Sequence, residues 1–256
     1  MTATPAVMAY AIYIRDTAPA QALSVDNFNK ANQLIGRLVG AGVWEDSTLI
    51  CYPYLGDTLH ATALLTDARR LTCATAVGTI IYHPGAISRT GASWVATGYT
   101  LPTTKTPMRV CEIVLNNIAN PSGTVPISVG ASDPVEGAYW YTSWLATPHT
   151  LRTAIYSSGS VVSYSAALGS RAIWQSNLKF EGLGGQNIYR DGTLISTISK
   201  TLLDHTPGEA YVGRGHSTSP IFVYSTLITA ATIVGLGVSD SAARQEYLGL
   251  QGLGKL

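Results

Sequence analysis

The chain has 256 residues, and its formal net charge at pH 7 is only +1. Charged residues make up 12% of the sequence, which is about half the share found in an ordinary soluble domain. This balance excludes a general electrostatic attraction to nucleic acid or to an anionic membrane. We therefore expect that the protein neither binds nucleic acid nor inserts into a membrane. A surface with so few charges suits a protein that is covered by other subunits.

The first 24 residues are predicted to form an N-terminal arm. The run from Val7 to Ile14, VMAYAIYI, is short, apolar and rich in residues that favour strands, and Arg15, Asp16 and Pro19 follow it. This pattern predicts one strand, which pairs with its own sheet or with a neighbouring copy of the chain. No basic region precedes the apolar run, which is unlike a signal peptide.

Residues 25–60 are predicted to hold a helix and a connecting strand. From Asp26 to Val43 the apolar period becomes 3.6 residues, which indicates an amphipathic helix. Ser24 or Asp26 can cap its start, whereas Gly40 and Gly42 suit its end. The expected apolar face consists of Phe28, Ala31, Leu34, Ile35, Leu38 and Val39. A strand-like segment over residues 44–54 follows the helix.

Short β-branched runs separated by turn residues dominate the chain after Thr106. We expect strands within residues 108–118, 124–129, 138–145, 151–156, 160–164, 171–176, 188–198, 209–212 and 221–234. Many short strands at this spacing indicate an antiparallel sandwich or jelly roll rather than alternating β-α-β units. The uncharged stretch over residues 220–238 is interpreted as buried strands, because hydroxyls, glycines and β-branched residues argue against a membrane helix.

Two local signals stand out in the last third of the chain. Asp191 and Gly192 lie between two β-prone runs, so they predict a two-residue type I′ turn, with Tyr189 opposite Leu194 and Ile188 opposite Ile195. Ser239 is a good N-cap for a short closing helix over residues 239–250. Its expected inner face consists of Ala242, Ala243, Glu246, Tyr247 and Leu250.

Several motifs resemble one superfamily of sandwich domains. GGQNIYRDGTLIST, TPGEAYVGRG and VGLGVSDSAARQEYLGL follow one another in the order typical of concanavalin A-like, laminin-G-like domains. ISRTGASWVATGYTL resembles the opening of such domains in structural proteins of tailed bacteriophages. The chain departs from the pattern at Val238, where leucine is common, and at Ala242 and Ala243, where an acidic residue is common. The resemblance implies a mainly β fold, an antiparallel concanavalin A-like jelly-roll sandwich over residues 61–256.

No catalytic signature is present in the sequence. Glycoside hydrolases of this superfamily place three carboxylates on one strand, and no acidic residues here have that spacing. There is no G-x-S-x-G turn, and the histidines lack the spacing of a catalytic or metal site. Asp133 and Glu136 form a compact acidic loop with too few oxygens for a firm calcium site. We therefore expect no catalytic residues, no enzymatic activity, no cofactor and no metal.

Aromatic side chains are the candidate carbohydrate-binding residues. Tyr139, Trp140, Tyr141 and Trp144 cluster on one expected strand, and Trp174 lies on another. Alternation puts Tyr139 and Tyr141 on one face and Trp140 and Trp144 on the other. One face packs into the core, whereas the other stacks sugars or contacts a partner subunit.

Two functions follow from these observations. The first is a non-enzymatic structural protein of a phage virion, such as a capsid decoration, head fibre or tail appendage subunit, that displays a lectin-like sandwich. Its expected location is the virion, and its expected partners are copies of itself and other virion proteins. The alternative is a carbohydrate-binding module that adheres to glycans or polysaccharide on the host surface. Cys51, Cys73 and Cys111 are expected as free thiols, with a single disulfide left open.

Overall fold

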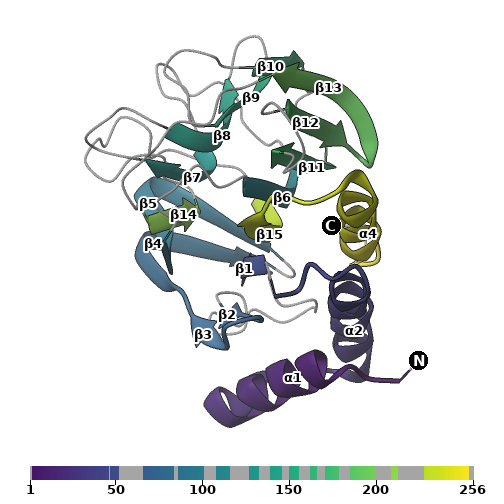
Figure 1. Ribbon diagram of the computed structural model, residues 1–256. Coiled ribbons are helices and arrows are strands. Elements are labelled where there is room, and N and C mark those ends of the chain that lie inside the picture. Colours follow the sequence, from purple (N-terminus) through teal and green to yellow (C-terminus); the bar gives the residue numbers. More distant parts are fainter. Residues whose placement is uncertain are drawn as a thin grey trace.

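The structure is a computed structural model (Figure 1). It describes residues 2–45, 47–51, 66–83, 86–100, 108–115, 127–132, 139–145, 150–155, 162–165, 171–178, 185–199, 209–212 and 228–253. Within these residues the fold is mainly β, with a few helices. The pairing is antiparallel at every strand pair, which agrees with the expected antiparallel β-sandwich class, while the jelly-roll connectivity stays a prediction.

The described strands all belong to one extended sheet. They are β1 (Ser47–Cys51), β2 (Thr66–Asp67), β3 (Thr72–Cys73), β4 (Thr75–His83), β5 (Ala86–Thr100), β6 (Met108–Leu115), β7 (Ile127–Ser132), β8 (Tyr139–Leu145), β9 (Thr150–Ile155), β10 (Val162–Ser165), β11 (Arg171–Leu178), β12 (Gly185–Arg190), β13 (Thr193–Ser199), β14 (Glu209–Val212) and β15 (Ile228–Leu236). The main path runs β10-β9-β8-β7-β14-β5-β15-β6-β11-β12-β13, with β4 beside β5 and β1 beside β15. Every expected strand after Thr106 therefore has a counterpart.

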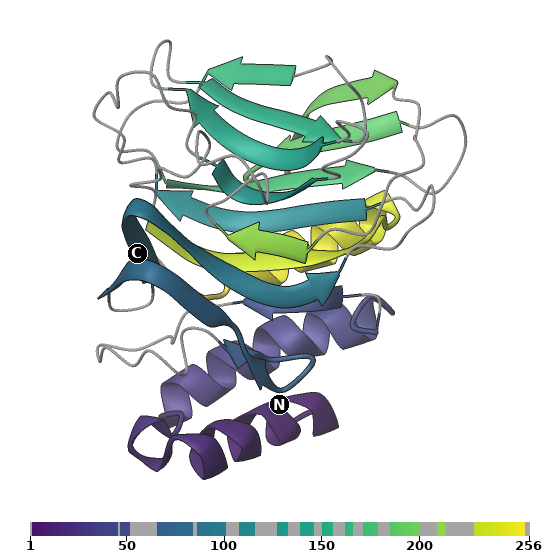
Figure 2. The same ribbon diagram turned by 90° about the vertical axis from the view of Figure 1, so that its left-hand side faces the viewer.

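The long strand β5 joins the two halves of this path. Near its start Ile87 pairs with Thr229 of β15, and near its end Val95 pairs with Val212 of β14. Along its other edge β5 pairs with β4 over most of its length. Figure 2 shows the strands stacked above the N-terminal helices, so these helices form a base under the sheet.

The N-terminal arm is a helix, and the prediction of a strand over residues 7–14 is wrong. Helix α1 spans Pro5–Thr17, with the Thr4 side chain accepting a hydrogen bond from the Val7 amide and Pro5 at the first helical position. A proline there is preorganised for a helix. Val7, Tyr10 and Ile14 are fully buried at helical spacing, so packing against the rest of the chain overrides the strand preference of the β-branched residues.

The second helix confirms the sequence expectation closely. A short 3-10 turn, η1 (Pro19–Gln21), leads into α2 (Val25–Gly40), and the Ser24 side chain accepts a hydrogen bond from the Asn27 amide. Ala31, Leu34, Ile35 and Leu38 are buried as expected, whereas Val39 at the edge of this face is exposed.

The closing helix α4 (Asp240–Gln251) begins after Ser239, whose side chain caps it as expected. Figure 1 shows α4 above α2 along one side of the sheet, beside β11 and β12. Gly249 permits the close approach of the two helices, because a Cβ at this position would lie 2.7 Å from a methyl carbon of Leu34. Residues of α1, α2, α4 and the sheet share one cluster of buried side chains.

A hairpin with the expected turn links β12 and β13. Asp191 and Gly192 have φ values of 50° and 75°, as a type I′ turn requires, and Tyr189 pairs with Leu194. Ile188 pairs with Ser196 rather than with Ile195, because an irregularity lies between Ile188 and Tyr189.

Other sequence expectations concern the membrane and the cysteines. No helix among the described residues has the length and apolar character needed to cross a membrane, and the second half of the 220–238 stretch forms β15. Cys73 is exposed and Cys111 is buried, and neither of them forms a disulfide. Asp133 and Glu136 lie outside the described residues.

Candidate functional site

A hollow lies between the start of α1 and the end of α2. Its volume is about 460 Å³, and Thr4, Pro5, Val39, Gly42, Trp44 and Glu45 line it. A volume of this size is within the range of small-molecule sites. Trp44 supplies an aromatic surface although only 7% of the residue is exposed, and the Glu45 carboxylate stands at the rim.

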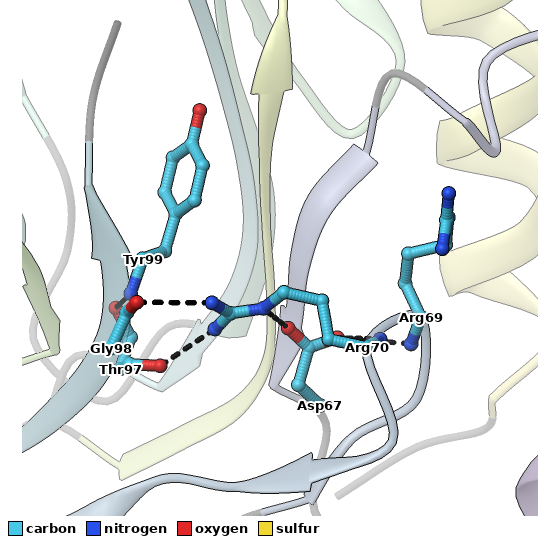
Figure 3. A network of polar contacts seen from close by, with 6 residues as sticks. All are labelled: Asp67, Arg69, Arg70, Thr97, Gly98 and Tyr99. Carbon is cyan, nitrogen blue, oxygen red and sulfur yellow. Dashed lines mark hydrogen bonds and ion pairs between the residues drawn. The ribbon is translucent and has the colours of Figure 1, made fainter.

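An ion-pair network adjoins this hollow through Glu45, whose carboxylate pairs with the guanidinium of Arg69. Figure 3 shows Arg69 and Arg70 on the turn after β2, with the Asp67 side chain facing their backbone. The Asp67 carboxylate accepts hydrogen bonds from the amides of Arg69 at 2.9 Å and Arg70 at 3.2 Å, and from Arg70 Nε at 2.5 Å. These bonds hold the turn in one conformation.

The guanidinium of Arg70 then ties this turn to strand β5. Its Nη1 donates to the Gly98 carbonyl at 3.1 Å and its Nη2 to the Thr97 carbonyl at 2.6 Å (Figure 3). The same group lies 5.8 Å from the centre of the Tyr99 ring, within range of a cation–π contact. Two positive and two negative side chains, Arg69, Arg70, Asp67 and Glu45, thus form a charge-balanced wall that reaches the hollow at Glu45.

This arrangement suits a ligand rich in hydroxyl groups. Sugar hydroxyls both donate and accept hydrogen bonds, and an exposed carboxylate paired with a guanidinium offers an acceptor and donors side by side. The apolar floor at Trp44 and Val39 matches the C–H face of a sugar ring.

The structure places the five aromatic candidates on two strands, β8 and β11. Tyr139, Trp140, Tyr141 and Trp144 all lie on β8, which is regular along its pairing with β9. In the backbone register Trp140 is opposite Ala131 and Ile155, and Tyr141 is opposite Gly130 and Ala154. The role of these four residues in sugar binding stays a prediction.

Trp174 lies on β11, and five strands separate β11 from β8 in the sheet order. Its residue is 2% exposed, and the guanidinium of Arg190 lies 5.4 Å from the centre of its ring. Stacking on a sugar requires an exposed ring, and the ring of Trp174 is buried. Trp174 packs into the sheet instead.

Sequence reasoning did not single out Trp44, Glu45, Arg69 or Arg70 as functional. The pair Trp44-Glu45 lies four residues after the end of α2, and the two arginines occupy a turn between very short strands. Nothing in their sequence spacing indicates that Glu45 meets Arg69, because the contact spans 24 positions and arises from folding.

A tyrosine–carboxylate pair marks the start of α4. The Tyr189 hydroxyl donates to Asp240 Oδ1 at 2.5 Å, and the Asn187 side-chain amide donates to both groups. Burial, together with the hydrogen bond to Asp240, raises the pKa of Tyr189 to about 12. The hydroxyl is therefore protonated at neutral pH and positions α4 through a hydrogen bond rather than acting as a nucleophile.

The Tyr189 pKa leads to a pH-dependent stability. The folded state keeps the proton up to about pH 12, whereas a tyrosine in the unfolded chain loses it near pH 10. The contribution of this group to the free energy of unfolding is thus complete below pH 10 and is lost as the pH rises toward 12. We expect urea unfolding between pH 9 and 12 to show a steeper decline for the natural protein than for Tyr189→Phe. Equal slopes would contradict this assignment.

Comparisons with known proteins identify the fold class. No family model and no curated protein matches the sequence. A mutant of Trypanosoma rangeli sialidase displaying trans-sialidase activity is similar in structure, with a TM-score of 0.61, 15% identity, and coverage of 89% of this chain and 38% of the sialidase. A structure of botulinum neurotoxin type C, whose cell entry depends on interaction with two ganglioside molecules, is also similar. Its TM-score is 0.55 at 12% identity, and the match covers 83% of this chain and 53% of the neurotoxin chain.

These likenesses support a β-sandwich type of fold. A second sialidase structure from the same organism, in complex with sialic acid, has a TM-score of 0.58 and 14% identity, with coverage of 82% of this chain and 34% of that chain. The chain therefore spans between a third and about two fifths of the sialidases to which it is similar.

The prediction that the chain is not an enzyme is contradicted by this comparison, because sialidases are enzymes. The prediction depended on the absence of a carboxylate triad and of a serine turn. Sialidases use a tyrosine nucleophile and stand outside the two-carboxylate pattern of most glycoside hydrolases. The missing motifs thus do not exclude catalysis in a chain of this fold.

Proposed function

We propose that the chain is a lectin-like protein that binds glycans, and that the hollow beside Trp44 and Glu45 is its binding site. One observation carries this proposal: an aromatic residue, Trp44, and an exposed carboxylate, Glu45, line a hollow of about 460 Å³, and this carboxylate pairs with the guanidinium of Arg69. The similar structures of a sialidase with sialic acid and of a neurotoxin that interacts with gangliosides support it.

A glycan array followed by calorimetric titration tests this function. We expect saturable binding of at least one glycan, with sialyllactose and lactose as the first pair to compare. Glu45→Ala and Arg69→Ala are each expected to weaken binding at least tenfold, or about 1.4 kcal/mol, because each removes hydrogen bonds from the rim.

Two further variants make the experiment specific. Arg15→Ala is the matched control, since Arg15 also forms an exposed ion pair, with Asp16 at 2.7 Å, near the opposite end of α1. It should bind as the natural protein does. Trp140→Ala tests the aromatic cluster on β8, and a loss confined to this variant would move the site to that strand. The absence of saturable binding to any glycan would contradict the proposal as a whole.

We further propose that this lectin-like domain is a structural component of a phage virion, such as a capsid decoration, head fibre or tail appendage subunit. The support is the resemblance of ISRTGASWVATGYTL to the opening of phage sandwich domains, together with the low charge. This stretch forms most of β5, after α2 and β1 in the expected order. Mass spectrometry and antibody labelling of purified particles should find the chain in fixed copy number, and its absence from particles would refute the role.

A further inference from the structure

Helix α1 has two apolar faces, and only one of them is buried within the chain. Val7, Tyr10 and Ile14 are buried against the rest of the chain. Met8 and Ile12, on the other face, are 44% and 43% exposed. No charged residue occurs between Pro5 and Ile14. A helix that is apolar on all sides is normally covered on all sides.

A groove runs beside this exposed face. It has a volume of about 340 Å³ and lies between α1 and the start of α2, lined by Met8, Ala11, Ile12, Leu23, Val25 and Phe28, with Arg15 at its end. Val25, on the far rim, is 80% exposed. Figure 1 shows α1 at the bottom of the molecule, away from the sheet path, so another molecule has access to it.

We propose that this surface is the contact between two copies of the chain, related by a two-fold axis. Met8 and Ile12 form an exposed apolar ridge, and this ridge is one wall of the apolar groove. A two-fold contact needs such self-complementarity, because the ridge of each copy then enters the groove of the other.

The charges around the groove favour a second copy over other partners. Arg15 pairs with Asp16 at 2.7 Å, and Lys30 pairs with Asp26 at 2.6 Å, so positive and negative charges balance within each copy. Two such rims meet without an excess of like charge, whereas they offer nothing that selects a strongly charged partner. A membrane surface is disfavoured, because a helix that lies on lipid carries several basic residues and α1 carries one.

The size of the surface sets the expected affinity. A helix of 13 residues is about 20 Å long, so the contact falls at the small end of specific interfaces. We therefore expect a dissociation constant in the micromolar range. This proposal is independent of glycan binding and of any virion.

Sedimentation velocity from about 1 to 300 µM tests the contact over the expected range. The average mass of the full chain should rise from one copy toward two. Ile12→Glu should weaken association at least tenfold, because it places a charge in the contact. Val25→Glu should do the same without harm to the fold, since an acidic residue at the first position of α2 suits the helix N-terminus.

Ile81→Glu is the matched control. Ile81 is 40% exposed, close to the value for Ile12, but it lies on β4. This variant should associate as the natural protein does. The proposal is overturned if the natural protein remains a single copy throughout the range. It is also overturned if both Ile12→Glu and Val25→Glu associate normally, or if Ile81→Glu dissociates as they do.

Discussion

Gly192→Ala is expected to lower the free energy of unfolding by about 2–4 kcal/mol, although it adds a single methyl group. Gly192 has a φ of 75°, and any side chain at this conformation is strained. In addition, the new Cβ would lie 2.6 Å from Cε1 and 2.7 Å from Cδ1 of Tyr247, and would also meet the Arg244 guanidinium. The arginine can swing away, whereas Tyr247 is 8% exposed and its ring is held in place.

Gly42→Ala separates the two causes of this effect. Gly42 has a similar φ of 71°, but nothing lies within 4 Å of a Cβ added there. Its cost should be the backbone strain alone, about 1 kcal/mol. Urea unfolding of both variants gives the difference, which measures the contact between the hairpin turn and α4. Equal losses would show that this contact does not restrict position 192.

The second large effect is expected at Glu246, which forms a buried ion pair. The Arg109 Nε lies 3.0 Å from Glu246 Oε1, and both side chains are 1% exposed. Gln175 donates to Glu246 Oε2 at 3.1 Å and to the Ala243 carbonyl at 2.9 Å, while Arg109 also donates to the Leu236 carbonyl. This network fixes the inner face of α4 onto β6 and β11.

Glu246→Leu should lower the free energy of unfolding by about 3–5 kcal/mol, because it removes the carboxylate that balances the buried charge of Arg109. The double variant Arg109→Met/Glu246→Leu should be more stable than Glu246→Leu alone, since it removes the stranded charge. Both are measured by urea unfolding.

Lys30→Ala is the control for the burial of the ion pair. It removes the partner of Asp26 in an exposed pair on α2, and its cost should stay within about 0.5 kcal/mol. A loss below about 1 kcal/mol for Glu246→Leu would mean that water reaches Arg109 in the variant.

Elements with strong local signals could be predicted from the sequence by itself. Asp191 and Gly192 determine the turn between β12 and β13, because both adopt a positive φ. Ser24 and Ser239 determine where α2 and α4 begin, because each side chain accepts a hydrogen bond from an amide one turn further on. These effects act within a few residues and need no tertiary contact.

Only the tertiary structure decided the features whose partners are distant in sequence. Residues 7–14 have both strand preference and helical spacing, and the burial of Val7, Tyr10 and Ile14 selects the helix. The meeting of Arg109 with Glu246 spans 137 positions, and that of Glu45 with Arg69 depends on the path of the chain between them. Because a single sequence records residue types but not which distant residues meet, the ion-pair wall, the hollow beside it and the burial of Trp174 became visible only in the folded chain.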